Sequence, residues 1–269
     1  PFMLTEWVRG NRMVLERNPN YNGPWQPTLD RVILYPTLNS AEVGFPAYLA
    51  GELDTTTLNA GQLALAQRQY EDQIQTNAAF VVFYLSYDYE TPPFNDPDVR
   101  RALLYSINRE EVTSTLLKDL AVPAETLLAP GFPGYNQDIA DQVVFDPERA
   151  QDYLAEAGYP GGEGFPTVTF YWREEGGATQ VVKPLAEYLQ AQWQEILGIN
   201  VELGSGDVAT WMDALMNTRY KMFLSPYAHD YVDPSNFFNI FVNPGSRHNW
   251  TNEEYNALVT EANRTQTWE

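Results

Sequence analysis

The chain has 269 residues, of which 44% are hydrophobic and 14% aromatic; this composition excludes general disorder and allows one large domain or two. Its 36 acidic and 16 basic residues give a formal charge of −20, which repels phosphate backbones, so we expect no nucleic acid partner. Cysteine is absent, which excludes disulfides, iron–sulfur clusters and cysteine catalysis, and no apolar run approaches the length of a membrane span.

The amino-terminal part of the chain predicts a small sheet followed by helices. Hydrophobic alternation on both sides of Gly10-Asn11 predicts a β-hairpin, because glycine and asparagine favour the tight turn that such a hairpin needs. Further apolar patterns predict, in chain order, a strand at 29–34, a helix at 41–49, a helix at 62–70 and a buried strand at 78–85.

The second part of the chain alternates helices and strands. Capping signals predict helix starts at Asp96-Pro97, at Asn108 with Glu111, at Asp146-Pro147 and at Thr251 with Glu254. Periodicity predicts a surface loop at 122–143, a strand at 167–172, a helix at 181–197 with Pro184 in its first turn, a strand at 199–203, a helix at 207–216 and a strand at 222–225. Gly158 and Gly198 are interpreted as helix stops. A strand, a helix and a strand over 167–203 form a parallel βαβ unit, so the predicted fold class is α/β.

The segment after the strand at 222–225 is the most informative part of the chain. It places Tyr227, His229, Asp230 and a second phenol on a loop that leaves a buried strand, where α/β sheets usually meet ligands. Aromatic faces beside one carboxylate suit an organic ligand with a positive or hydroxyl-rich group. For Asp230 a ligand site and a simple turn both remain open, whereas Asp233 is interpreted as a turn residue.

A second pair of candidate residues, Trp172 and Arg173, ends the strand at 167–172. In a parallel sheet this strand end lies beside the end of the strand at 222–225, so we expect both residues to line one wall of a cleft with Tyr227 and Asp230. The alternative is that Trp172 fills the core and Arg173 pairs with a neighbouring glutamate on the surface.

Other signs of catalysis or metal binding are weak. Glu174-Glu175 follow a strand end and support a carbohydrate-active enzyme as an alternative function, although a solvated loop is the simpler interpretation. The two histidines have no partner at helical metal spacing, so we expect no metal site made by this chain alone and no cofactor. We interpret His248 as an exposed loop residue.

Several short motifs occur in one consistent order. They are ERNPNY at 16–21, AGELD at 50–54, PPFNDPDVRRAL at 92–103, DPERA at 146–150, LAEAGYP at 154–160, GINVEL at 198–203 and DYVDP at 230–234. Together they resemble the family 5 solute-binding proteins of ABC importers, which are peptide, oligopeptide and nickel binders. The resemblance implies a type II periplasmic-binding-protein fold, with residues 1–85 in the first, hinge-side lobe and residues 86–269 in the second, ligand-binding lobe.

The resemblance also implies a function without chemistry of its own. The expected role is to bind a peptide or related small solute in an inter-lobe cleft and to deliver it to the transmembrane subunits of an ABC permease. The expected location is extracytoplasmic, in the periplasm or anchored at the outer face of a bacterial cell, with the signal segment and other family portions outside this chain. Oligosaccharide binding and a sensor domain remain alternatives.

Residue roles follow from the same resemblance. Asp230 occupies the position of an aspartate that holds the ligand's free amino group in the peptide binders, and Tyr227 stands in place of a tryptophan. Val208 replaces another cleft tryptophan, and Leu215 and Leu224 replace basic residues. Such departures imply the loss of positive charge that would meet a peptide carboxylate, so amines, dipeptides and oligosaccharides stay open as ligands. The expected ligand-binding residues are Asp230, Tyr227, His229, Trp172 and Arg173.

Overall fold

The computed structural model describes residues 1–38, 40–76, 79, 81–117, 120–174, 179–217, 221–242 and 248–265. The chain divides into two compact units, Pro1–Gln75 and Thr76–Glu269. This division precedes residue 85, where the lobe boundary was expected. The reason is that β4 (Val81–Tyr87) pairs with β7 (Met222–Ala228) and so belongs to the sheet of the second unit.

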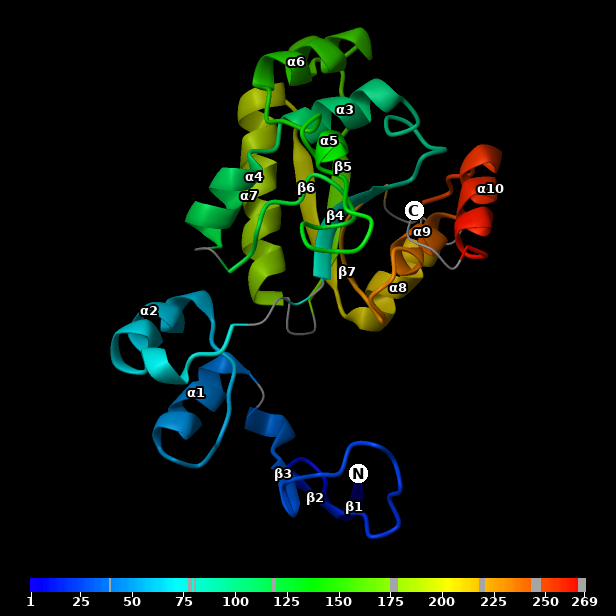
Figure 1. Cartoon of the computed structure of the whole chain (residues 1–269). Helices are drawn as coiled ribbons and strands as arrows, with labels where there is room; N and C mark the ends of the chain where they lie inside the picture. Colours follow the sequence, from blue (N-terminus) through cyan, green and yellow to red (C-terminus); the bar gives the residue numbers. More distant parts are fainter. Residues whose placement is uncertain are drawn as a thin grey trace. The chain divides into compact units, whose positions relative to one another are not determined.

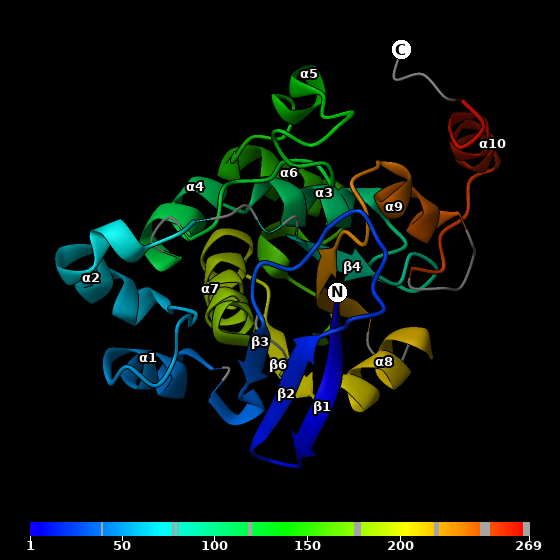
Figure 2. The same ribbon diagram turned by 60° about the horizontal axis from the view of Figure 1, so that its bottom comes forward.

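The first unit contains a three-stranded antiparallel sheet followed by short helices (Figures 1 and 2). The hairpin across Gly10, whose φ is 68°, is confirmed. The elements of this unit are β1 (Phe2–Val8), β2 (Arg12–Arg17), β3 (Arg31–Leu34), η1 (Pro36–Leu38), α1 (Ala41–Leu49), α2 (Ala60–Gln69) and η2 (Glu71–Gln73).

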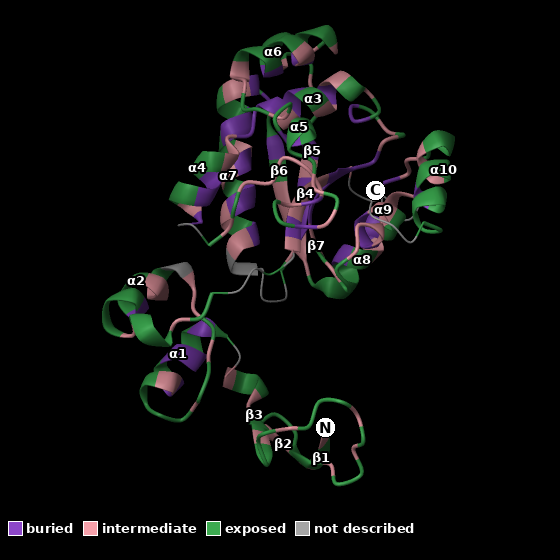
Figure 3. Ribbon diagram, in the orientation of Figure 1, coloured by how far each residue is buried: buried purple, intermediate pink, exposed green. Residues whose placement is uncertain are grey.

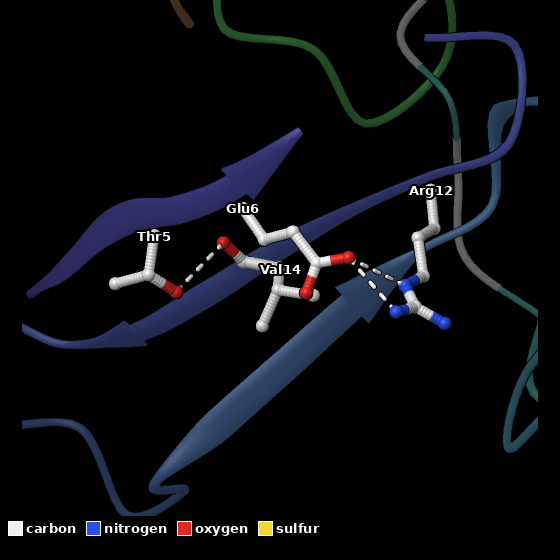
Figure 4. A network of polar contacts seen from close by, with 4 residues as sticks. All are labelled: Thr5, Glu6, Arg12 and Val14. Atoms are coloured by element: carbon white, nitrogen blue, oxygen red, sulfur yellow. Dashed lines mark hydrogen bonds and ion pairs between the residues drawn. The ribbon is translucent and has the colours of Figure 1, made fainter. Parts of the chain in front are cut away.

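A β-bulge at Thr5 interrupts the pairing of β1 with β2, since the register shifts between Leu4 and Glu6. The Thr5 hydroxyl donates to the carbonyl oxygen of Val14 at 3.4 Å (Figure 4). The Arg12 guanidinium donates twice to Glu6 Oε1, from Nε at 3.0 Å and from Nη2 at 2.8 Å. These polar contacts support the register at the extra residue and at Glu6, the residue after it.

The bulge gives this small sheet one apolar face. Leu4 pairs with Leu15 and Trp7 pairs with Met13, so these four side chains share a face although Leu4 and Trp7 are an odd number of residues apart. Trp7 is 61% exposed. Figure 3 shows mostly exposed and intermediate residues on β1–β3, whereas buried residues gather in the sheet and helices of the second unit.

The second unit is built on a four-stranded mixed sheet with the order β4-β7-β5-β6. β5 (Val168–Arg173) is parallel to both β6 (Val201–Gly206) and β7, whereas β4 is antiparallel to β7. This confirms the predicted parallel pair and the α/β class. The other elements are α3 (Pro97–Tyr105), α4 (Arg109–Glu111), the π-helical turn η3 (Val112–Leu116), α5 (Gln137–Ala140), α6 (Pro147–Glu156), η4 (Pro160–Gly162), α7 (Thr179–Leu197), α8 (Val208–Met216), α9 (Ser235–Phe238), η5 (Asn239–Phe241) and α10 (Glu253–Ala262).

Alternation along β5 separates two layers of core. Phe170 and Trp172 pack into the largest core cluster, which includes Trp193 of α7. Tyr171 points to the opposite side and joins a cluster with Trp211 of α8. α7 and α8 therefore cover opposite faces of the sheet, as Figures 1 and 2 show.

Most helix starts lie where the capping signals predicted. Asp96 and Asp146 cap α3 and α6 by accepting backbone N–H groups, and Asn108 does the same for α4. The cap of α10 is Asn252, which accepts from Tyr255 N–H, so the prediction of Thr251 was one residue early.

Two other details differ from prediction. α7 begins at Thr179, and Pro184 therefore lies inside the helix rather than in its first turn. The predicted surface loop at 122–143 buries Leu128 and Phe132, because both join a third apolar cluster with Val82 and Phe237. Within the described residues, no helix combines the length and the apolar character that a bilayer crossing requires.

Candidate functional site

The ends of β5 and β7 lie at the same end of the sheet, as the sequence predicted. The parallel register pairs Trp172 with Leu224, so both strands run out in the same direction. The antiparallel register pairs Ala228 with Val81, the first residue of β4. β4 therefore begins at the end of the sheet where β7 runs out into Asp230.

Tyr227 is half-buried and packs on α9. Its ring centroid lies 5.0 Å from that of Phe237, and its hydroxyl donates to the carbonyl oxygen of Asn236 at 3.0 Å. Phe237 itself is completely buried. The Tyr227 side chain therefore has its hydroxyl engaged and its ring in contact with Phe237.

His229 lies between two phenylalanine rings. Its imidazole stacks on Phe132 with 3.9 Å between centroids and 28° between planes, and it meets Phe237 edge-on at 3.9 Å. Phe132 comes from the 122–143 segment, far away in the chain. These two ring contacts hold the backbone just before Asp230 against the apolar cluster that contains Phe132 and Phe237.

Asp230 presents its carboxylate to solvent. The residue is exposed, and within the described part of the chain its carboxylate forms no hydrogen bond or ion pair. Its backbone N–H donates to Asn236 Oδ1 at 3.4 Å. Asp233, in contrast, accepts from Ser235 N–H at 2.8 Å, which confirms its interpretation as a turn residue.

Trp172 and Arg173 point to opposite sides of the sheet. Trp172 is 5% exposed and belongs to the main core, which is the alternative that the sequence left open. The Arg173 guanidinium lies 5.9 Å from the Trp211 ring of α8. Glu174 accepts a hydrogen bond from the Ser205 hydroxyl, and no ion pair joins it to Arg173 among the described residues. Glu175 lies outside the described residues.

Leucine was expected to replace basic family residues at two positions, and both positions lie in the core. Leu215 and Leu224 are 1% and 2% exposed and pack on opposite faces of the sheet. Val208, the first residue of α8, is 38% exposed. Leucine at 215 and 224 therefore serves packing here, and these two positions give no reason to expect a lost positive charge at the strand end.

His248 is buried, so the prediction of an exposed loop residue was wrong. Its Nδ1 lies 2.8 Å from the Ser86 hydroxyl, its ring stacks on Phe241 with 4.6 Å between centroids, and its carbonyl accepts from Tyr89 N–H at 3.1 Å. The partners come from β4, the turn after it and η5, which the local sequence around His248 does not reveal. The described residues contain no group of three or more acidic or histidine side chains arranged to bind a metal.

The residues that sequence reasoning missed are those that hold the loop in place. Asn236 is 5% exposed and contacts both Tyr227 and Asp230, and Phe132 covers His229. The sequence did offer a signal for Asn236, because the polar pair Ser235-Asn236 directly follows Asp233-Pro234. No pattern near residue 132 indicates its partner.

Residues 1–249 match the family described as "Bacterial extracellular solute-binding proteins, family 5 Middle". The probable deoxycholate-binding periplasmic protein YgiS of Escherichia coli K12 is 27% identical over 267 residues, covering 97% of this chain and 49% of that protein. The dipeptide-binding protein of the same organism is 24% identical over 241 residues, covering 88% and 44%. The chain thus spans about half the length of the curated relatives it matches.

Solved structures agree with this match. A periplasmic oligopeptide-binding protein from Borrelia burgdorferi aligns with a TM-score of 0.79 and 26% identity, over 100% of this chain and 53% of that chain. An oligopeptide-binding protein from Thermotoga maritima aligns with a TM-score of 0.84 over 100% and 56%, and at 20% identity this likeness shows the fold alone. The predicted periplasmic-binding-protein fold is confirmed, and the family consists of binding proteins of transporters rather than enzymes. This chain therefore belongs to the family 5 bacterial extracellular solute-binding proteins.

Proposed function

We propose that this chain binds a peptide or a related small solute that carries a positively charged amino group, as part of the solute-binding component of an ABC importer. The observation that carries the proposal is the exposed Asp230 carboxylate, which has no partner among the described residues and stands where β7 leaves the sheet. The solute is delivered to membrane permease subunits outside the cytoplasm. This location is supported by relatives that are named as periplasmic proteins.

The charge of Asp230 narrows the ligand class. Relatives are named for oligopeptides, dipeptides, deoxycholate and heme, so family membership alone leaves the ligand open. An unpaired carboxylate attracts an ammonium group by a charge-assisted hydrogen bond and repels the carboxylate of a bile acid. An amine-bearing ligand is therefore favoured over an anionic one.

The proposal places the ligand in the inter-lobe cleft that the family resemblance predicted, with Asp230 as counter-ion. Tyr227 and His229 hold the turn that carries this carboxylate, and Trp172 and Arg173 end the neighbouring strand β5. Support comes from the family match and from the exposed carboxylate at the end of β7. Closure of the two lobes is the working motion in this proposal.

A thermal-shift panel on the full chain tests the proposed ligand class. The probes are trialanine, N-acetyl-trialanine, the dipeptide Ala-Phe, spermidine, maltotriose and deoxycholate. Because a ligand that binds only the folded state raises the melting temperature by mass action, a free-amine probe should raise it and N-acetyl-trialanine should not. A rise with deoxycholate or maltotriose alone would overturn the amine-binding proposal.

Asp230→Asn then tests the counter-ion by isothermal titration with the best amine probe. Loss of a charged hydrogen bond of about 1.5–3 kcal/mol predicts affinity weaker by about 10- to 150-fold. Asp152→Asn is the matched control, since it removes the same charge from an exposed position on α6. Equal affinity of Asp230→Asn and the control would remove Asp230 from the site.

A further inference from the structure

The turn after β7 exposes a second aromatic residue beside Asp230. Tyr231 is 51% exposed and Val232 is 56% exposed, whereas Tyr227 is half-buried with its hydroxyl bonded to Asn236. An aromatic ring can stack on a ligand only with a free face, and Tyr231 has the larger free surface of the two tyrosines.

We infer that Tyr231, rather than Tyr227, supplies the aromatic contact to the ligand, and that Ser235 and Asn236 are positioning residues for Tyr231 and Asp230. This inference rests on the proposed function. It replaces the role that family resemblance gave to Tyr227 with a residue that the resemblance did not single out.

Two neighbouring residues at the start of α9, Ser235 and Asn236, each contact one residue of the turn after β7. The Asn236 side chain accepts from Asp230 N–H at 3.4 Å, and the Ser235 hydroxyl lies 3.3 Å from the Tyr231 hydroxyl. Both distances are at the long end of the hydrogen-bond range. The turn is closed by Asp233, whose N–H donates to the Tyr231 carbonyl at 3.0 Å. Asp230 and Tyr231 are thus each tied to α9 by a separate contact.

α9 is itself fixed by the core. Phe237 is completely buried and packs in one cluster with Phe132 and Val82. The 122–143 segment approaches the start of the helix closely, because a β-carbon added to Gly134 would lie 3.2 Å from Pro234 Cγ. A recognition turn anchored in this way loses little conformational freedom when a ligand binds.

The chemistry of the pair suits an ammonium group. A carboxylate supplies the opposite charge, and the face of a phenol ring attracts a cation through its quadrupole. Tyr231→Ala should therefore weaken the binding of the best amine probe of the panel (trialanine, Ala-Phe or spermidine) by about 10-fold. Phe145→Ala, at a 41% exposed aromatic residue ahead of α6, should leave affinity unchanged.

A double-mutant cycle tests the positioning role of Ser235. Ser235→Ala and Tyr231→Phe remove the same exposed hydrogen bond, so each should weaken binding by about 2- to 5-fold, and the double variant should be no weaker than either. Melting temperatures without ligand should stay within about 1 °C of wild type, because the contact is at the surface. Additive losses, or unchanged affinity in Ser235→Ala, would overturn the positioning role.

The outcomes separate this inference from the proposed function. If Asp230→Asn weakens binding while Tyr231→Ala binds like wild type, the function stands and the inference falls. Weakening in Tyr227→Leu, which removes the ring, but not in Tyr231→Ala would return the aromatic role to Tyr227. If no amine probe raises the melting temperature of the wild-type chain, the proposed function and the inference fall together.

Discussion

The ring of Phe132 stacks on the imidazole of His229 with 3.9 Å between centroids, joining the 122–143 segment to the turn that carries Asp230. Phe132 is 3% exposed and shares its cluster with Phe237 and Val82. The 122–143 segment thus contributes core packing beside the candidate site rather than a free surface loop.

Removal of this ring should destabilise the second unit. Phe132→Ala leaves a cavity beside His229 and Phe237, and truncation of a buried phenylalanine costs about 3–5 kcal/mol. Urea denaturation followed by tryptophan fluorescence measures the loss. Phe145→Ala, at a residue that is 41% exposed, should cost about 1 kcal/mol or less. Similar losses in the two variants would contradict the packing role of Phe132.

Tyr255 should make stability depend on alkaline pH. Its hydroxyl donates to the Phe238 carbonyl at 2.8 Å, and burial raises the pKa of Tyr255 to about 12. The unfolded phenol titrates near 10, so the stabilisation by the neutral form is complete below pH 10 and is lost as the pH rises towards 12.

The comparison of wild type with Tyr255→Phe isolates this effect. The variant lacks the hydrogen bond and should be about 1 kcal/mol less stable at pH 8, a value that allows for partial solvent screening of the group. The difference should shrink steadily between pH 10 and pH 12 in chemical denaturation. A constant difference over that range would show that the folded and unfolded phenols titrate alike.

Gly198 should tolerate no side chain. Its φ is 68°, and a β-carbon there would lie 2.2 Å from the carbonyl oxygen of Gly161. Gly198→Ala should therefore cost about 3 kcal/mol or more, from left-handed strain and from the displaced backbone. Gly158→Ala is the matched control, because its φ is 93° and nothing lies within 4 Å of the added carbon. The control should cost about 1–2 kcal/mol from strain alone, and equal melting temperatures would contradict the close approach.

Local sequence rules predicted the elements whose causes are local. The Gly10 turn, the Asp96 and Asp146 caps and the Gly158 stop all lie where short patterns placed them, since each depends on hydrogen bonds within a few residues. The α10 cap failed by one residue, because Thr251 and Asn252 are both good caps and local pattern does not choose between them.

Side-chain environments at the strand ends were less predictable. Parallel pairing of β5 with β7 was predicted and found, yet Trp172 faces the core and Arg173 faces α8. Successive strand residues alternate between faces, so shared strand ends do not bring all four expected side chains to one wall. His248 was misjudged for a similar reason, since its burial depends on Ser86 and Phe241.

The amino-acid sequence by itself determined the α/β order, most helix starts and the family, because periodicity, capping and short motifs are properties of neighbouring residues. Only the tertiary structure decided which side chains of the segment 227–232 are free. Tyr227 and His229 are covered by Asn236, Phe237 and Phe132, whereas Asp230 and Tyr231 remain exposed. The exposure of a side chain depends on which distant residues pack against it, and that packing is settled only when the chain has folded.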